Sequence, residues 1–291
     1  MAKPHAWTIQ MYADILCSET PATKLRMQRA EGLVRVALHR KAGATRVREL
    51  LQSGCTKLRL PTKLVSQASQ EAILINTAGG LTGGDRIETE ILAVNGSDAI
   101  VTTQACERIY RSTGDMATVA TRLTVEENAR LAWLPQETIL FNEGRLARTL
   151  DVQLHANAEL LAVEAVLFGR KAMNEAVRCG SFHDRWRIRR DGKLVFADDV
   201  RLEGNIAEKL ARPCFFGNQM AMATLLLIGD DTEQLLQPVR EAIDDLGGAT
   251  AFEGKLVARM TAPDSLVLRR HLEPALAILM RGRTLPKVWQ I

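Results

Sequence analysis

Apolar and polar side chains alternate along much of the first hundred residues. Val34, Val36 and Leu38 share one phase, and Arg35 and His39 share the other. A period of two places successive side chains on opposite faces of an extended chain, so this pattern predicts a β-strand with one buried face. The same period recurs in the segments 46–48, 57–60, 86–94 and 100–104. The chain is therefore expected to be mainly β, with many short strands joined by polar turns.

A glycine-rich loop follows the apolar run 72–75, which itself predicts a buried strand. Four glycines at positions 79, 80, 83 and 84 precede Asp85. Glycine at this density indicates positive φ or the close approach of another segment. The loop does not match a phosphate-binding loop, because no Lys-Ser/Thr follows and the next segment alternates as a strand does. Asp85 is either a functional carboxylate presented by the loop or a turn residue that bonds its own backbone.

Two further signals concern how the strands connect. Asn95-Gly96 lies between two alternating runs and predicts a β-hairpin. Residues 123–141 align with residues 150–168 at an offset of 27 without gaps, with seven identities in nineteen positions. Such an internal repeat predicts strand–turn–strand layers that bury their apolar faces on one another, as in a β-helix.

The repeat places two carboxylates, Glu137 and Glu164, at equivalent positions within apolar strands. A carboxylate buried there is costly unless it is paired, hydrated or bound to a cation. One interpretation pairs these residues with Arg145 or Arg170, and the other places them along a water-lined interior passage. Asp198 adds an acidic group after another strand, where an exposed turn is the simpler interpretation.

The C-terminal part changes to a helical period. One helix is predicted from Asp231 to Leu246 and a second over 264–279, with a strand over 254–260 between them. We therefore predict a mainly β fold: a layered, β-helix-like stack of short strands with two C-terminal helices. Residues 1–28 show no sustained period and are expected to form a flexible N-terminal extension, and residues 29–291 a single domain.

The charge is uneven along a chain whose net charge is +4. Residues 24–63 contain eleven Lys/Arg and two Glu, which is typical of a solvated sheet face or of a site for an acidic protein partner. Nucleic acid is not an expected partner, because no aromatic residue interleaves with these charges for base stacking. No apolar run reaches transmembrane length and the N-terminus lacks an apolar signal core, so we expect a cytoplasmic protein without membrane contact.

The composition also bears on the chemistry available. The five cysteines are odd in number and scattered, so neither a disulfide framework nor a zinc site is expected. The five histidines show no pair at metal-ligand spacing. No nucleophile elbow or metalloprotease motif is present, so an enzyme is not expected.

The ordered motifs of this chain resemble those of a known family. The segments that carry the resemblance are GGLTGGD at 79–85, TTQA at 102–105 with YRS at 110–112, WLPQE at 133–137 with Phe141, Gly169-Arg170, and Pro286 with Trp289. Over roughly residues 30–291 they are similar to the urease accessory protein UreD family, called UreH in some systems. The chain departs from the family pattern at Asn174-Glu175, where Gly-Glu is usual. It also departs at Arg86, where an acidic residue occurs in some relatives, which argues against a paired acidic site beside Asp85.

The resemblance implies an accessory protein that does not turn over a substrate. Such proteins bind UreF and, through it, the GTPase UreG, and they dock this assembly on apo-urease. Nickel then passes to the urease active site through an interior tunnel, with no cofactor held tightly by the chain itself. Sparse carboxylates and water fit this role, because a conduit must release its ion.

On this basis Asp85, Glu164 and Asp198 are the expected tunnel-lining residues, with Glu137 as a further candidate. Two rival hypotheses remain. The chain is a pure protein-binding scaffold with no metal passage, or it is an unrecognised hydrolase.

Overall fold

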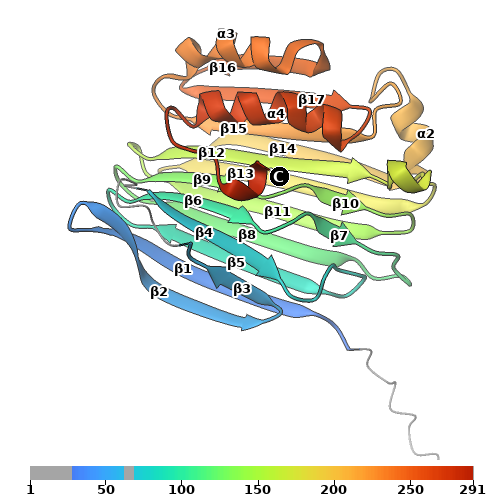
Figure 1. The fold of residues 1–291 in the computed structure, drawn as a ribbon, viewed down its shortest axis with the longest axis horizontal. Helices are drawn as coiled ribbons and strands as arrows, with labels where there is room; N and C mark the ends of the chain where they lie inside the picture. The colour runs from blue at the N-terminus through green and yellow to red at the C-terminus, as the bar shows by residue number, and fades with distance from the viewer. Residues whose placement is uncertain (1–27, 62–68, 291) are drawn as a thin grey trace, which may run out of the picture.

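The computed structural model describes residues 28–61 and 69–290, which form two large sheets that face each other (Figure 1). The first sheet has the strand order β14 (Lys193–Gly204), β13 (Gly180–Arg190), β11 (Arg145–Leu154), β8 (Ala117–Val125), β5 (Arg86–Ala93), β1 (Glu31–Lys41) and β2 (Ala44–Gly54). The second sheet has the order β16 (Gly247–Phe252), β17 (Lys255–Ala262), β15 (Ala221–Ile228), β12 (Glu159–Phe168), β9 (Arg130–Leu134), β6 (Asp98–Thr103), β4 (Gln70–Asn76) and β3 (Thr56–Arg59). The expected mainly β fold is therefore confirmed.

The chain passes back and forth between the two sheets, so that each new strand lies beside the one before it in its own sheet. β5, β8, β11 and β13 are parallel to their predecessors in the first sheet. β4, β6, β9 and β12 are parallel to one another in the second sheet. Two short strands, β7 (Glu107–Ile109) and β10 (Thr138–Leu140), continue this stack beside the end of β12. The result is the predicted β-helix-like stack.

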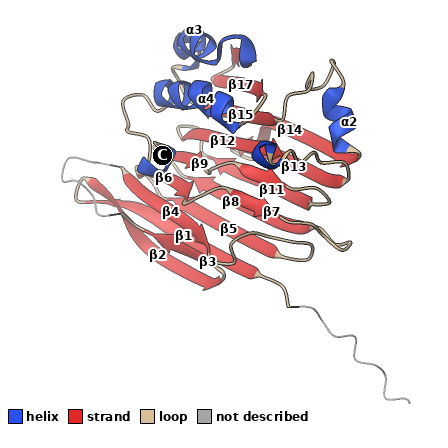
Figure 2. Cartoon of the chain, turned by 45° about the vertical axis from the view of Figure 1, so that its right-hand side comes forward, coloured by secondary structure: helices blue, strands red, loops and turns tan. Residues whose placement is uncertain are grey.

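Helices cover the outer face of the second sheet. α3 (Thr232–Ile243) and α4 (Ser265–Leu279) pack there, and α2 (Ile206–Ala211) lies near the end of β14 (Figure 2). Three short 3₁₀ turns complete the list: η1 (Lys171–Met173), η2 (Asp244–Leu246) and η3 (Lys287–Trp289). Because its two faces are both covered, the second sheet contains continuous apolar strands such as β15, which is buried throughout. The outer face of the first sheet is solvated, which explains the strict alternation along β5 and β11.

Two apolar clusters fill the space between the sheets. One contains Val34, Leu131 and Trp186, and the other contains Leu81, Phe168 and Phe182. The two clusters do not merge along the inward faces of the strands, because polar side chains separate them. On β12, for example, Glu164 lies between Ala162 of one cluster and Val166 of the other. This break in the apolar core positions the candidate site.

Two predictions about connections were wrong. Asn95-Gly96 does form a turn, with Gly96 at φ +67°, but the turn carries the chain from β5 in the first sheet to β6 in the second. The turn residues are local signals and do not say which sheet the next strand joins. Strand layers do repeat along this part of the chain, but the predicted offset of 27 residues between them is wrong. Leu131 pairs with Leu160, 29 residues away rather than 27, because apolar identities in a Leu/Ala-rich sequence do not fix the register.

The two predicted C-terminal helices are confirmed. α4 begins after Asp264, whose carboxylate accepts a hydrogen bond from the Val267 amide at 2.9 Å, as an N-cap residue does. Pro238 and Pro274 lie inside α3 and α4 without ending them. The strand predicted over 254–260 is β17, and its hairpin partner β16 was missed. Of the predicted extension 1–28, residues 1–27 lie outside the described residues.

Candidate functional site

A cavity opens where strands of the second sheet are interrupted. β6 ends at Thr103 and β7 begins at Glu107, while β9 ends at Leu134 and β10 begins at Thr138. Pro135 has no backbone N–H to donate within this break. The neighbouring strand β12 runs through without interruption. The sheet therefore has a gap in its hydrogen-bonded backbone, bounded on one side by a complete strand.

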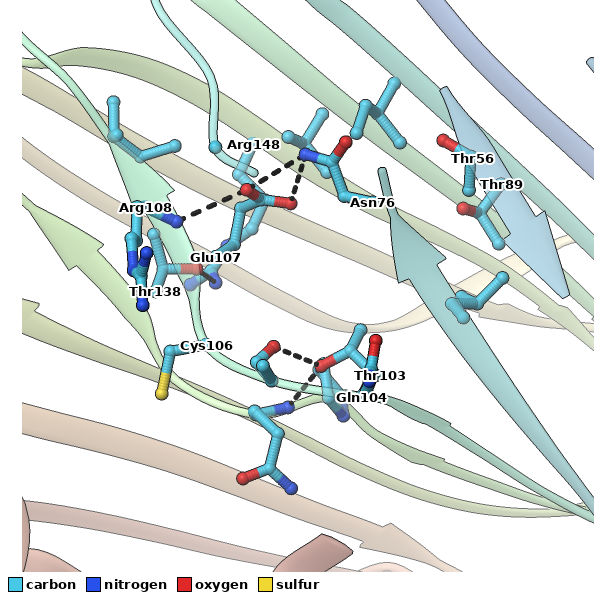
Figure 3. Close-up of a pocket in the computed structure, with 18 of the residues that line it drawn as sticks. Thr56, Asn76, Thr89, Thr103, Gln104, Cys106, Glu107, Arg108, Thr138 and Arg148 are labelled. Atoms are coloured by element: carbon cyan, nitrogen blue, oxygen red, sulfur yellow. Dashed lines mark hydrogen bonds between the residues drawn. The ribbon is translucent and has the colours of Figure 1, made fainter. Parts of the chain in front are cut away.

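The cavity has a volume of about 220 Å³ and reaches from this gap into the space between the sheets. Its outer lining includes Gln104, Cys106 and Glu107 from the break between β6 and β7 (Figure 3). Its inner lining consists of inward-facing side chains of both sheets: Thr89, Val119, Thr121, Trp133, Leu146, Arg148 and Glu164. A cavity of this size, with several polar side chains in its lining, has room for several water molecules.

Glu107 is the acidic group at the outer end. Both of its carboxylate oxygens lie 3.1 Å from Asn76 Nδ2, and Oε1 also accepts a hydrogen bond from the Arg108 amide (Figure 3). Burial raises the pKa of Glu107, and the hydrogen bonds from Asn76 and the Arg108 amide oppose that shift. The carboxylate faces the cavity with no cationic side chain bonded to it among the described residues.

A buried ion cluster forms the inner end. Arg148 on β11 lies 2.5 Å from Glu164 Oε2 on β12 and 2.7 Å from Asp184 Oδ2 on β13. Trp133 Nε1 donates to Glu164 Oε1 at 2.9 Å, and Arg148 also donates to Thr138 Oγ1. One guanidinium thus serves two carboxylates, which leaves one excess negative charge when both are ionised.

The protonation of this cluster follows from its burial. Burial raises the pKa of Glu164 to about 7, the charge of Arg148 lowers it, and the nearby charge of Asp184 raises it. Burial alone would lower the pKa of Arg148, but the two carboxylates raise it above its ordinary value, so the guanidinium stays charged. Near neutral pH the inner end therefore alternates between no net charge and one negative charge.

The partners predicted for Glu164 were wrong. Arg145 lies on the same strand as Arg148 but in the outward phase, and Arg170 pairs with Glu175 instead. The interpretation that Glu164 is paired is nevertheless correct, because Arg148 neutralises it. Glu164 also lines the cavity.

Glu137 is not equivalent to Glu164. It lies in the break between β9 and β10, and its carboxylate contacts α4, where Arg269 Nε donates to Oε1 at 2.6 Å. Burial by itself would raise the pKa of Glu137, but the hydrogen bonds and charge of Arg269 outweigh burial and lower it. Cys106 Sγ lies 3.3 Å from Glu137 Oε2, and burial together with this carboxylate raises the pKa of the thiol to about 12. Glu137 ties α4 to the wall of the cavity.

Asp85 does not line the cavity. Its two oxygens accept hydrogen bonds from the backbone amides of Ala30, at 2.8 Å, and Thr82, at 2.7 Å. The carboxylate therefore fastens the start of β1 to the glycine loop, in agreement with the turn interpretation of this residue. The loop has the special backbone expected of it, since Gly79, Gly80 and Gly84 all have positive φ.

Asp198 lies on β14, also away from the cavity lining, and forms an ion pair with Arg259 of β17. The structure thus does not bring Asp85, Glu164 and Asp198 together in one cavity. Only Glu164 of the three lines it. Sequence reasoning missed Glu107, Arg148 and Asp184. For the last two a signal existed, because each is a charged residue in the apolar phase of an alternating strand.

The donor set does not resemble a tight metal site. In residues 28–61 and 69–290, no group of three or more His, Cys, Asp or Glu side chains is arranged to hold a metal ion. Among the described residues, none of the helices has the length and apolar character needed to span a lipid bilayer. The cavity offers carboxylate, amide and hydroxyl oxygens, which bind a hydrated divalent cation weakly.

Comparison with known proteins covers nearly the whole chain. Residues 30–290 match the model of the family described as UreD urease accessory protein. The urease accessory protein UreD of Rhizobium leguminosarum bv. viciae is 49% identical over 273 residues, which is 94% of this chain and 99% of that protein. Those of Agrobacterium fabrum and Chelativorans sp. are 47% and 48% identical and are covered over 93% and 99% of their lengths.

Proposed function

This chain belongs to the UreD family of urease accessory proteins, and from that premise we propose that it delivers nickel to urease. In this proposal it holds a UreF-like partner and, through it, the GTPase UreG on apo-urease, as a chaperone of metallocentre assembly. Nickel enters the interior of the chain through the cavity as a hydrated ion in transit, and the chain itself has no catalytic role.

The main support for this proposal is the course of the cavity through the structure. It starts at a gap in the second sheet, where Glu107 is partly buried, and it ends between the sheets at Glu164. Carboxylates at its two ends attract a divalent cation, and in a low-dielectric interior this attraction is stronger than in bulk water. The threonine hydroxyls of the inner lining, those of Thr89 and Thr121, provide oxygen contacts to a hydrated ion.

Release is as important as entry for a conduit. Nickel is held tightly by imidazole and thiolate, and the described residues that line the cavity include no histidine. Among them, the cysteine Cys106 has a raised pKa and stays a neutral thiol, which is a poor metal ligand. At the inner end, Arg148 compensates much of the negative charge and so prevents a divalent ion from being trapped there. These features support passage rather than storage.

A second candidate function is a protein-binding scaffold with no metal passage. The observation in its favour is that Arg148, Glu164 and Asp184 satisfy one another. An ion cluster of this kind explains why Glu164 is buried without any role in transport. The two functions differ in whether blocking the cavity alters the nickel content of urease.

The test blocks the cavity without touching the ion cluster. Thr121 is buried on the inward face of β8 and lines the cavity, whereas Thr124 on the same strand is exposed. Thr121→Phe adds a ring inside the cavity, and Thr124→Phe makes the same change outside it. We expect Thr121→Phe to keep its melting temperature within a few degrees and to form the complex with the partner proteins, while the urease produced with it is nickel-poor and weakly active.

The matched variant Thr124→Phe is expected to yield nickel-loaded urease. Nickel per urease active site, measured by elemental analysis of purified urease, is the readout. Complex formation is checked by size-exclusion chromatography of the purified proteins. Fully loaded urease from cells with a folded, complex-forming Thr121→Phe variant would reject the passage and leave the scaffold function.

A further inference from the structure

The stack ends in a turn that nothing in the described structure covers. β2 pairs only with β1 in the first sheet, and β3 pairs only with β4 in the second (Figure 1). β2 is eleven residues long, and over 49–53 no other strand among the described residues pairs with the backbone N–H and C=O groups of its outer edge. A bulge opposite Ala37/Leu38 interrupts its pairing once, and the segment 49–54 beyond it is regular. This is an edge that another strand can join.

Apolar side chains are exposed along the same edge. Leu50 pairs with Val36, which faces the core, yet it is 41% exposed because no further turn stacks over it. Leu51, on the opposite face of β2, is 52% exposed. Leu60, just after β3, is exposed as well. Apolar side chains on both faces of an edge strand provide contacts to alternate side chains of an added strand.

The charge around this edge is strongly positive. Residues 31–61 contain seven Lys/Arg and two Glu. Arg46, Arg48 and Arg59 are exposed, and the carboxylate that Arg48 contacts belongs to its own neighbour Glu49. An incoming segment that carries negative charge is favoured by this field, and a positive one is disfavoured.

The charge decides which occupant fits. A second copy of the chain paired through β2 would bring two sets of arginines together, which is repulsive. The chain's own segments 1–27 and 62–68 each carry one more positive than negative charge, so neither complements the edge. Nucleic acid fits poorly, because residues 31–61 contain no Phe, Tyr or Trp side chain on which a base could stack. Of the occupants considered for this edge, only an acidic polypeptide complements its positive charge.

We propose that an acidic, extended segment of a partner protein adds a strand beside β2 and so closes the open end of the stack. Its acidic side chains pair with Arg46 and Arg48, and its apolar side chains pack against Leu50 and Leu51. This inference does not depend on whether nickel passes through the cavity, since no residue of β2 lines the cavity.

The test uses the purified full-length chain and a fluorescein-labelled peptide of alternating glutamate and valine. Fluorescence anisotropy measures the affinity, and hydrogen exchange followed by mass spectrometry locates the binding site. We expect the peptide to slow exchange of the amides in 44–54, and not in β14 at the opposite edge of the first sheet. A peptide of alternating lysine and valine is expected to bind at least about tenfold more weakly.

Variants of the β2 edge, compared with a control variant on β14, show which residues contact the peptide. Arg46→Glu combined with Arg48→Glu is expected to weaken binding of the acidic peptide by about tenfold or more, and Leu51→Ser by a smaller factor. Leu194→Ser, at an exposed leucine of the opposite edge strand β14, is the control and is expected to bind as the unaltered chain does. Each variant's melting temperature shows whether it is folded.

Three results would overturn the proposal. The acidic peptide does not bind, or it binds without protecting 44–54, or Leu194→Ser weakens binding as much as Leu51→Ser does. An oligothymidylate that competes with the peptide and binds more tightly would instead identify the edge as a nucleic-acid site.

Discussion

Arg148 is the residue whose removal tests the interior most directly. Arg148→Met keeps the length of the side chain and removes the cation that Glu164 and Asp184 share at 2.5 and 2.7 Å. Taking away one partner of a buried ion pair costs about 3–5 kcal/mol, because the remaining charge is left uncompensated. The Coulomb attraction of one such pair, about 4 kcal/mol at an effective dielectric constant of 20, is of the same size. We expect the free energy of unfolding to fall by about 3–5 kcal/mol at pH 7.5.

The loss should depend on pH and become smaller as the pH falls. Without the guanidinium, a carboxyl group of the folded chain takes up a proton, so its pKa lies above the unfolded value. A group of this kind stabilises the folded state below the unfolded pKa, and that stability is lost as the pH rises. Glu164 already behaves so in the unaltered chain, with its pKa raised to about 7. In Arg148→Met the folded cluster holds one further proton, with the same sign.

Between pH 7.5 and pH 5.5, folded Arg148→Met is expected to bind one more proton than the folded unaltered chain does. At 1.36 kcal/mol per pH unit, the deficit of Arg148→Met relative to the unaltered chain should shrink by about 2.7 kcal/mol between pH 7.5 and pH 5.5. Urea denaturation followed by tryptophan fluorescence at the two pH values measures it. Arg145→Met, on the same strand but in the outward phase, is the control and is expected to change stability by less than about 1 kcal/mol. A deficit below about 1 kcal/mol for Arg148→Met, or one that does not change with pH, would refute this account of the cluster.

Two further predictions concern the glycine loop. Gly83→Val should lower the melting temperature by several degrees, because its Cβ would lie 2.1 Å from Ser112 Oγ and 2.4 Å from the Asp115 carbonyl oxygen. Gly248→Val, at a position with open space, is the thermal-melting control, and equal melting temperatures would contradict the steric argument. Asp85→Ala should cost about 1–3 kcal/mol in urea denaturation, since it leaves the Ala30 and Thr82 amides without their acceptor. Nickel-poor urease from a fully stable Asp85→Ala variant would instead support a transport role for this residue.

The alternation of apolar and polar residues predicted the strands well because one face of the first sheet is buried and the other is solvated. It could also have identified the partner of Glu164. Arg145 and Arg148 are both on β11, but only Arg148 shares the phase of Leu146 and Leu150. A charged residue in the apolar phase must meet an opposite charge in the interior, so phase selects Arg148 and rejects Arg145.

Other features of the site could not be predicted from the sequence. The cavity exists because two successive strands break at the same level, and the length of each break depends on the register between neighbouring strands. Glu107 looked like an ordinary polar residue of a strand end, and Asp198 and Glu137 like acids in or beside apolar strands. Their partners Arg259 and Arg269 lie 61 and 132 residues further along the chain, so no local pattern indicated the pairing.

The antiparallel pairing of β12 with β15 has a consequence for synthesis of the chain. Most strands of the stack find their neighbour about thirty residues earlier, so a turn can close as soon as it leaves the ribosome. β12 is different, because one of its edges stays open until β15, where Leu167 pairs with Ala221. At 5–20 residues per second, making the intervening roughly 50 residues takes about 3–10 s. During these seconds one edge of a strand that is buried along most of its length is exposed, which is when a holding chaperone or an early-binding partner would protect it best.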